Sequence, residues 1–341
     1  MSRVSVIQNF IIIACRYFVF AQGNRVTLIF RYSLKVVPYI IMAFVITSCL
    51  GGGTGTIKET PTSGDIRILV DESFQPIIEA ETATFTSLYM NAKITPVYKP
   101  EVDVVNEFMN DSAKVMVTSR KLSDDQIKFL RDTLIVARTT TFAYDALALV
   151  THRDNYDSLL KYEEVKNIFT GKITSWNEIN PKSKLGKIRV IFDNPKSGNI
   201  RFFRERFDIK DQLPSNFFAV NSNSEVIDFV TRNRDAIGIV SVNWISDKDD
   251  STSRSFVRKV RVIAVSQPYL EEDSYYPPKQ GNIYDKSYPF IREIYLISRE
   301  TFSGLGSGFI NWACAEQGQR IVLKSGLLPA TMPIRLVQIK Q

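Results

Sequence analysis

Short apolar runs alternate with longer amphipathic segments along most of the chain. The short runs end at polar residues and predict strands at 66–70, 94–98, 114–118, 146–151, 188–192, 236–241 and 294–298. Between them, apolar residues recur at helical spacing and predict helices at 74–89, 102–109, 123–131, 162–169, 199–207, 224–233 and 306–317. Strands and helices that alternate in this way are typical of an α/β fold.

The first 49 residues do not fit this alternation. They contain five Lys and Arg residues and no Asp or Glu. Arg31 and Lys35 precede an apolar run at 36–46, and small residues follow it up to Cys49. A run of this length is too short to span a bilayer as a stable helix, so it predicts a cleaved export signal. The pattern resembles that of bacterial lipoproteins, which implies a signal peptide at 1–48 and lipid on Cys49.

Residues 49–64 contain few side chains that could pack in a core, and they predict a flexible tether. No acidic run follows Cys49, which favours a periplasmic protein held on a membrane by its lipid. Each buried methylene of an acyl chain contributes about 0.8 kcal/mol, so two or three chains anchor a protein durably. An alternative is a transmembrane anchor that begins near Ile7, in which Cys49 has no special role.

The positive charge of the chain is concentrated in this leader. Without its five basic residues, 38 Lys and Arg stand against 36 Asp and Glu, so the formal charge falls from +7 to +2. Such a balance gives no reason to expect nucleic-acid binding. About 280 residues follow the tether, which is more than one hydrophobic core usually organises, so two lobes are expected.

Cysteine and histidine are too scarce for most catalytic or metal-binding arrangements. Cys15 leaves with the signal and Cys49 is acylated in this interpretation, so Cys314 has no partner for an intramolecular disulfide. Cys314 lies in an apolar helical stretch, where a buried, inert thiol is expected. His152 is the only histidine, and it follows an apolar strand, which predicts a surface position at the strand end. Catalytic triads and histidine zinc sites therefore lack their residues.

Three predicted strand-to-helix turns carry side chains suited to an anion. They lie at 70–74, 117–121 and 192–199, and ligands of open α/β sheets bind where strands end and helices begin. In the third turn Ser197 can cap the next helix, and Gly198 lets the backbone approach a ligand. The helix amides that follow carry a partial positive charge. Simple helix capping is the alternative explanation of each turn.

Charged residues at the strand ends leave further alternatives open. Arg120 presents a planar fork of donors that matches an oxyanion, although a surface ion pair would explain it as well. Asp71 and Asp193 could each accept a proton from a ligand or pair with a neighbouring cation.

Five stretches, at 118–122, 145–150, 168–176, 236–240 and 304–308, resemble a known family. The most specific is Ile-Phe-Thr-Gly-Lys-Ile-Thr-Ser-Trp at 168–176, together with the later Ala-Ile-Gly. In these stretches the chain is similar to the PstS-like phosphate-binding proteins of ABC importers, in the periplasmic binding-protein superfamily. The likeness extends from residue 66 to residue 337.

This resemblance implies a two-lobed α/β fold of the type II periplasmic binding proteins, with a hinge and a ligand cleft between the lobes. Lobe one is expected at 65–141 and 263–341, and lobe two at 142–262. A monomer would close over phosphate or a related oxyanion and dock on an ABC permease and its ATPase, with no cofactor, metal ion or covalent step. The implied ligand-binding residues are Ser73, Phe74, Ser119, Arg120, Asp145, Asp193, Ser197, Gly198 and Asn199.

The third turn departs from the pattern of the family. Its best-known members read Arg-Ser-Asp-Gly-Ser-Gly-Thr, whereas Asp193, Pro195 and Asn199 hold the arginine, aspartate and threonine positions here. The family's aspartate accepts the proton of hydrogen phosphate and repels sulfate, so this discrimination is not implied for the present chain. Asp193 could take over that role.

Two alternative functions stay open. A binding-only sensor or surface lipoprotein of the same fold could hold another oxyanion or a phosphorylated ligand without a transporter. A phosphatase-like enzyme would need a nucleophile near Arg120, for which Ser73 and Ser119 are the candidates.

Overall fold

The computed structural model describes residues 59–247, 251–268 and 274–333. The predicted signal peptide, Cys49 and the predicted tether before Glu59 lie outside these ranges. The chain divides into two units, Met1–Ile57 and Lys58–Gln341, and the second is a compact body with its own hydrophobic core. No helix within the described ranges is long and apolar enough to cross a membrane.

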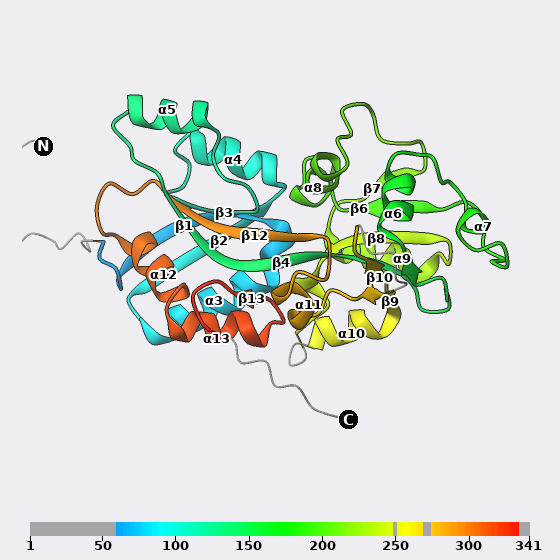
Figure 1. Ribbon diagram of the computed structural model, residues 1–341. Helices are drawn as coiled ribbons and strands as arrows, with labels where there is room; N and C mark the ends of the chain where they lie inside the picture. The colour runs from blue at the N-terminus through cyan, green and yellow to red at the C-terminus, as the bar shows by residue number, and fades with distance from the viewer. Residues whose placement is uncertain (1–58, 248–250, 269–273, 334–341) are drawn as a thin grey trace, which may run out of the picture. The chain divides into compact units, whose positions relative to one another are not determined.

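A ten-stranded mixed sheet runs through this body (Figure 1). Its main path has the order β2-β1-β3-β12-β4-β8-β6-β7, and β9 and β13 also pair with β4. The strands are β1 (Gly64–Asp71), β2 (Ala92–Lys99), β3 (Val115–Thr118), β4 (Arg138–His152), β6 (Arg189–Phe192), β7 (Phe217–Ala219), β8 (Ala236–Ser241), β9 (Val260–Val262), β12 (Ile291–Ser298) and β13 (Leu328–Pro329). A smaller sheet consists of β5 (Leu159–Leu160), β10 (Ala264–Ser266) and β11 (Tyr275–Tyr276).

Strand β4 connects two parallel halves of the large sheet. β1 pairs in parallel with β2 and β3, and β6 pairs in parallel with β7 and β8. The first part of β4 pairs with β12 as far as Ala146, and the next residue, Leu147, already lies opposite Ser241 of β8. Figure 1 shows β4, in green, crossing from the β1–β3 half to the β6–β8 half. One strand is thus shared by both halves of the body.

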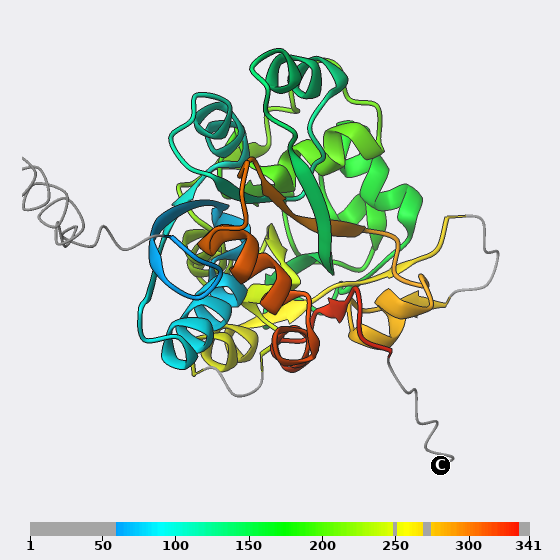
Figure 2. The ribbon, with the colours of Figure 1, turned by 90° about the vertical axis from the view of Figure 1, so that its left-hand side faces the viewer.

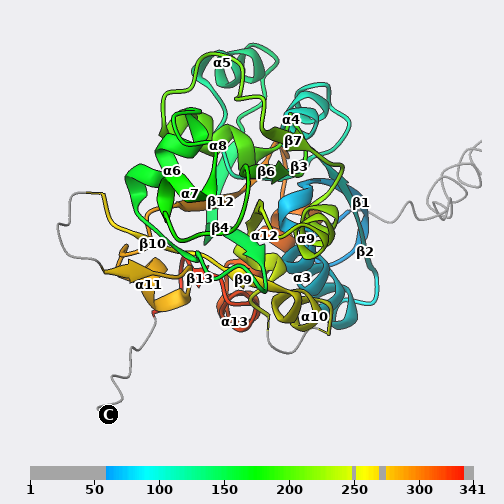
Figure 3. The same cartoon turned by 90° about the vertical axis from the view of Figure 1, so that its right-hand side faces the viewer.

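Helices cover both faces of the β1–β3 half (Figure 2). Side chains alternate along β1, so Ile68 and Val70 pack in the same cluster as Phe85 of α3, while Leu69 packs with Val104 and neighbouring residues of α4. Figure 3 shows α6, α7 and α8 at the other half. The helices are η1 (Glu72–Phe74), α3 (Gln75–Leu88), α4 (Glu101–Met109), α5 (Asp124–Asp132), α6 (Tyr162–Phe169), α7 (Trp176–Ile179), α8 (Gly198–Arg206), α9 (Asn223–Arg232), η2 (Val242–Trp244), α10 (Ser251–Lys259), α11 (Gln280–Tyr284), α12 (Leu305–Ala313) and α13 (Glu316–Lys324).

The predicted strands and helices occur, with differences that have local causes. The predicted strand at 146–151 is only the end of β4, because the first residues of β4 are polar and partly exposed and form no apolar run. The predicted helix at 306–317 ends at Ala313, because Ala315 has an extended backbone and a new helix, α13, begins at Glu316. The prediction lacks strands β5, β7, β9, β10, β11 and β13, since a run of two or three residues is too short to show a periodic pattern.

Cys314 and His152 take the positions that their surroundings predict, with one correction. His152 ends β4, and its Nδ1 accepts a hydrogen bond from the backbone N–H of Asp154 at 3.0 Å. Cys314 is a free thiol, but it is half-buried instead of fully buried because it lies at the end of α12. Burial raises the pKa of Cys314 to about 11, so the thiol is protonated and unreactive at neutral pH.

Candidate ligand-binding site

Residues of the three predicted turns lie together at the start of α8. Ser73, in the turn after β1, donates from Oγ to Asn199 Oδ1 at 3.1 Å, and both residues are fully buried. A methyl group on the α-carbon of Gly198 would lie 2.8 Å from Ser119 Oγ and 2.8 Å from Asp71 Oδ2. Contacts this short leave no room for a side chain, so the close approach of the turns requires glycine at this position.

Asp193 organises the third turn. Its Oδ1 accepts a hydrogen bond from Ser197 Oγ at 2.6 Å, and its Oδ2 accepts one from Asn199 Nδ2 at 3.2 Å. Ser197 also caps α8, because its Oγ accepts from the backbone N–H of Ile200 at 3.4 Å. Burial raises the pKa of Asp193 to about 6, although the hydrogen bond from Ser197 opposes this shift. Both oxygens of Asp193 are therefore engaged in shaping the loop.

Asp71, at the end of β1, has one oxygen without a partner. Its Oδ1 accepts the backbone N–H of Ser73 at 3.0 Å, whereas its Oδ2 makes no hydrogen bond to any described residue. Burial and then the charge of Glu101 raise the pKa of Asp71 to about 8. The carboxyl group is therefore mainly protonated at pH 7, and Oδ2 is available to a ligand at the start of α8.

Glu101 is a buried carboxylate that the sequence does not single out. It begins α4 and accepts hydrogen bonds from Thr118 Oγ1 at 2.9 Å, from Ser119 Oγ at 2.6 Å and from the backbone N–H of Ser119 at 3.1 Å. Arg201 of α8 donates from Nε to Glu101 Oε2 at 2.5 Å. Burial opposes ionisation, but the hydrogen bonds and charge of Arg201 outweigh it, so the pKa of Glu101 lies below its usual value. Glu101 is thus an ionised link between the two halves.

Arg201 is the cation that contacts the second turn. Its Nη2 donates to Ser119 Oγ at 2.9 Å, and its Nη1 pairs with Glu205, one turn later in α8, at 2.7 Å. Arg120 lies beside Ser119 in the sequence, but its guanidinium donates to Gln126 Oε1 in the first turn of α5, at 3.4 Å. The structure therefore places Arg201, and not Arg120, in direct contact with the Ser119 hydroxyl.

Arg292 of β12 forms a second buried cation, at the crossing of β4 and β12. Its Nε donates to Asp145 Oδ2 at 2.9 Å, while Ser241 Oγ donates to Asp145 Oδ1 at 3.0 Å. The guanidinium lies over the ring of Phe74, with its carbon 4.8 Å from the ring centroid, and its two Nη atoms have no hydrogen-bond partner in the described part of the chain. Asp145 therefore orients Arg292 beside Phe74. None of these contacts connects Asp145 to the start of α8.

Comparison with known proteins places this architecture in a family. The sequence model of the PBP superfamily domain matches residues 56–317, which is most of the chain. The chain belongs to the PBP superfamily. The resemblance predicted from the sequence is thereby confirmed, as is the two-lobed α/β fold.

Relatives of this PBP-superfamily protein are named for phosphate. The phosphate-binding protein PstS of Staphylococcus aureus is 21% identical over 282 residues, which cover 81% of this chain and 82% of that protein. Among solved structures, a chain from Clostridium perfringens described as a phosphate ABC transporter substrate-binding protein with bound phosphate has a TM-score of 0.67 and 24% identity. The alignment covers 78% of this chain and all of that one. An ABC-type phosphate transport receptor from Vibrio cholerae has a TM-score of 0.59 and 20% identity, over 79% of this chain and all of that one. These relatives are binding proteins and not enzymes.

Sequence reasoning missed Glu101, Arg201 and Arg292. Glu101 follows a proline at a helix start, where an acidic residue is ordinary because it complements the helix dipole. Arg201 could have been predicted from the sequence, since it lies four residues after Ser197 and therefore on the same side of the helix. Arg292 carried no signal, because its partner Asp145 lies on a strand that is distant in the sequence.

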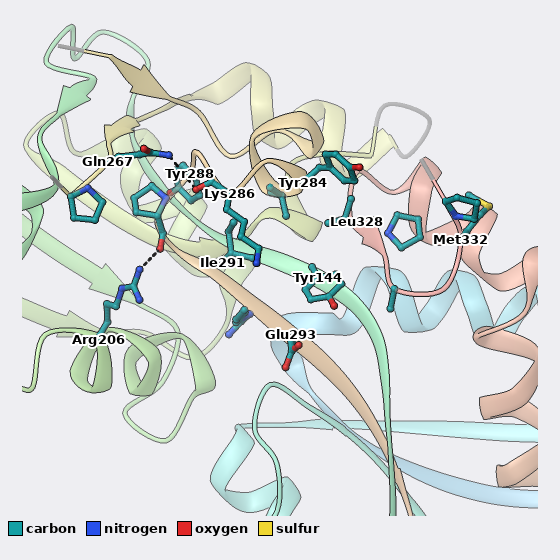
Figure 4. A pocket seen from close by; sticks show the side chains of 17 residues that line it. Tyr144, Arg206, Gln267, Tyr284, Lys286, Tyr288, Ile291, Glu293, Leu328 and Met332 are labelled. Atoms are coloured by element: carbon teal, nitrogen blue, oxygen red, sulfur yellow. Dashed lines mark hydrogen bonds between the residues drawn. The ribbon is translucent and has the colours of Figure 1, made fainter. Parts of the chain in front are cut away.

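The three turns coincide neither with a metal centre among the described residues nor with the cavity beside β4 and β12. Within the described residues no group of three or more His, Cys, Asp or Glu side chains could hold a metal ion. A cavity of about 970 Å³ lies beside the pairing of β4 and β12, lined by Tyr144, Tyr284 and Glu293 among others (Figure 4). Of the predicted or observed site residues, Arg292 alone also lines this cavity.

Proposed function

We propose that this PBP-superfamily protein is a lipid-anchored, periplasmic receptor that captures phosphate, or a closely related oxyanion, for an ABC importer. The observation that carries the proposal is the meeting of Ser73, Ser119 and Gly198 at the first turn of α8. Helix amides at this end carry a partial positive charge, and hydroxyl groups complete a set of donors suited to an oxyanion. The names of the relatives point to the same ligand class.

The charged residues divide into two roles in this proposal. Arg201 supplies the cation next to the Ser119 hydroxyl, and Asp145 holds Arg292 against Phe74. Arg120, which the sequence predicts as a ligand residue, has no part in this proposal because its guanidinium donates to Gln126. Closure of lobe two (142–262) over lobe one (65–141 and 263–341) would bring the donors together, and the closed monomer would dock on the permease and its ATPase.

The anchor is part of the same proposal. Lipid on Cys49 and a tether before Glu59 would hold the body near a membrane while leaving it free to reach a permease. The tether predicted at 49–64 is too long at its end, because Glu59 pairs with Lys114 and Gly64 begins β1. Cys49→Ala in the full chain should release the protein into the soluble periplasmic fraction and abolish incorporation of labelled palmitate. Retention of both the membrane association and the label in the variant would contradict the anchor.

Calorimetry of the body 58–341 tests the ligand. This unit has its own core, so it serves without the leader. Phosphate should bind with a dissociation constant in the micromolar range or below, and Ser197→Ala should weaken it at least about tenfold, because the cap that positions the α8 amides is lost. Sulfate, arsenate and molybdate titrated in parallel define the selectivity. Absence of heat from all four anions would refute the ligand class while leaving the fold intact.

A further inference from the structure

Ser119 and Arg201, two of the residues proposed for the ligand, already donate to a side chain of the protein. The hydroxyl and the backbone N–H of Ser119 both donate to Glu101, as does Thr118 Oγ1. Arg201 donates to both carboxylate oxygens of Glu101, from Nε at 2.5 Å and from Nη2 at 3.2 Å. A carboxylate that accepts from two hydroxyls, a backbone amide and a guanidinium satisfies the same set of bonds as a bound oxyanion.

The position of this carboxylate coincides with the start of α8. A methyl group on Gly198 would lie 3.0 Å from Glu101 Oε1, beside the 2.8 Å contacts to Ser119 Oγ and Asp71 Oδ2. The Glu101 side chain is 1% exposed, so no bulk water lies between it and these donors. Glu101 therefore occupies the space in which an anion would face the first turn of the helix.

We infer that Glu101 is an internal anion, which fills the proposed oxyanion site at the start of α8 and must leave before a ligand enters. The inference rests on the proposed function, since it concerns the same donors. Two anions cannot share this site, because like charges a few ångströms apart repel strongly where water is excluded. Capture of an oxyanion is thus an exchange reaction: the Glu101 carboxylate moves out to water, and the ligand takes over its hydrogen bonds.

Further contacts join the two halves beside Glu101. The backbone N–H of Val102 donates to Lys196 O at 3.2 Å, and Lys196 Nζ pairs with Asp103 at 3.0 Å. Both contacts connect the start of α4 to the third turn, as the pair of Glu101 and Arg201 does. The protein itself thus supplies a negative charge at these donors. Because a ligand has to displace Glu101, this residue sets how tightly any ligand can bind.

The test compares phosphate binding by the wild-type body and by Glu101→Ser, with Glu101→Gln as the variant closest in shape. Glu101→Ser frees the donors of Thr118, Ser119 and Arg201 and should lower the dissociation constant for phosphate at least about tenfold. Glu107→Gln is the matched control, because it removes an acid of the same helix that pairs with Lys99 and not with Ser119 or Arg201, and it should stay within about twofold of wild type. Acetate should compete with phosphate in Glu101→Ser, by refilling the vacated place, and should not compete in Glu107→Gln.

The outcomes separate this inference from the proposed function. Binding by Glu101→Ser but not by the wild type would support the internal anion and refute phosphate as the natural ligand. Binding by the wild type with no gain in a folded Glu101→Ser or Glu101→Gln variant would overturn the internal anion and leave the proposed function standing. Absence of phosphate binding by the wild type and by every variant would overturn both the internal anion and the proposed function.

Discussion

Two buried glutamates of the β1–β3 half, Glu81 and Glu101, have opposite ionisation behaviour. Both residues are fully buried in helices that pack on the same part of the sheet. Neither oxygen of Glu81 has a hydrogen-bond partner in the described part of the chain, and burial raises its pKa to about 9. The pKa of Glu101 lies below its usual value, because Arg201 and three donors from Thr118 and Ser119 outweigh burial.

The difference shows that partners, and not depth, decide whether these two glutamates are charged. Glu81 is a neutral group within α3 at pH 7, and its ionisation would be costly. Glu101 is a permanent anion, held by donors from both halves. An acid of the first kind adds sensitivity to pH, whereas one of the second kind marks a site built for negative charge.

Removal of the partner of Glu101 should give the largest effect on stability. Arg201→Ala leaves a buried carboxylate without its cation, which should lower the free energy of unfolding by about 3–5 kcal/mol in urea denaturation. The double variant Arg201→Ala with Glu101→Gln should recover most of this loss. Arg204→Ala, on the same helix and bonded only to backbone carbonyls at the surface, is the control. An equal loss in the single and double variants would show that the charge of Glu101 is not what Arg201 stabilises.

Neutralisation of Glu81 should remove a pH dependence. Its folded pKa of about 9 exceeds the unfolded value, so the folded state holds a proton that the unfolded state loses. The free energy of unfolding is unaffected by Glu81 below the unfolded pKa of 4.5, and it decreases as pH rises from there toward 9. Glu81→Gln should therefore be more stable than wild type by on the order of 3 kcal/mol at pH 7, and its unfolding free energy should vary less with pH. Glu79→Gln, at a surface position of the same helix, should leave the pH profile of wild type unchanged.

Asp71 resembles Glu101 at one oxygen and Glu81 at the other, since Oδ1 accepts a hydrogen bond and Oδ2 has no partner among the described residues. Its pKa of about 8 predicts that phosphate affinity falls about tenfold between pH 8 and pH 9.5, as the ionised carboxylate begins to repel the anion. Phosphate itself keeps one charge state over this interval. Asp71→Asn should bind phosphate with the same affinity at both pH values in calorimetry. A decline of the same size in the variant would exclude Asp71 as the titrating group.

Arg120 of the second turn should give the smallest effect, in contrast to Arg201 of α8. Arg120→Ala should change phosphate affinity by less than about threefold, because its guanidinium donates to Gln126 in the structure, while Arg201→Ala should weaken binding more. Both variants can be titrated in one calorimetric series. A larger loss of phosphate affinity in Arg120→Ala would show that Arg120 contacts the ligand and that the second turn rearranges on binding.

The sequence predicts the strands and the three turns, and it fails where partners come from distant segments. Apolar runs reveal β1, β3 and β8 because these strands are buried on both faces. The polar start of β4 gives no such run, although it extends the strand that connects the halves. Ser73, Ser119 and Gly198 were identified because turn chemistry is local.

The charge arrangement could not be predicted, because it depends on pairs that are far apart in the chain. Glu101 and Arg201 meet only when α4 and α8 come together, and Arg292 is held by Asp145 across a strand pairing. Asp193, considered from the sequence as a proton acceptor, has both oxygens occupied by its own loop. Sequence patterns thus located the donors, and the fold was needed to show which acid faces them.

The absence of a side chain at Gly198 has one more consequence. Ser119 Oγ lies close to this α-carbon while Glu101 and Arg201 hold it in place. A single added methyl group would therefore keep the two halves from approaching each other fully. A permease that recognises only the closed form would not respond to such a receptor at any concentration of solute.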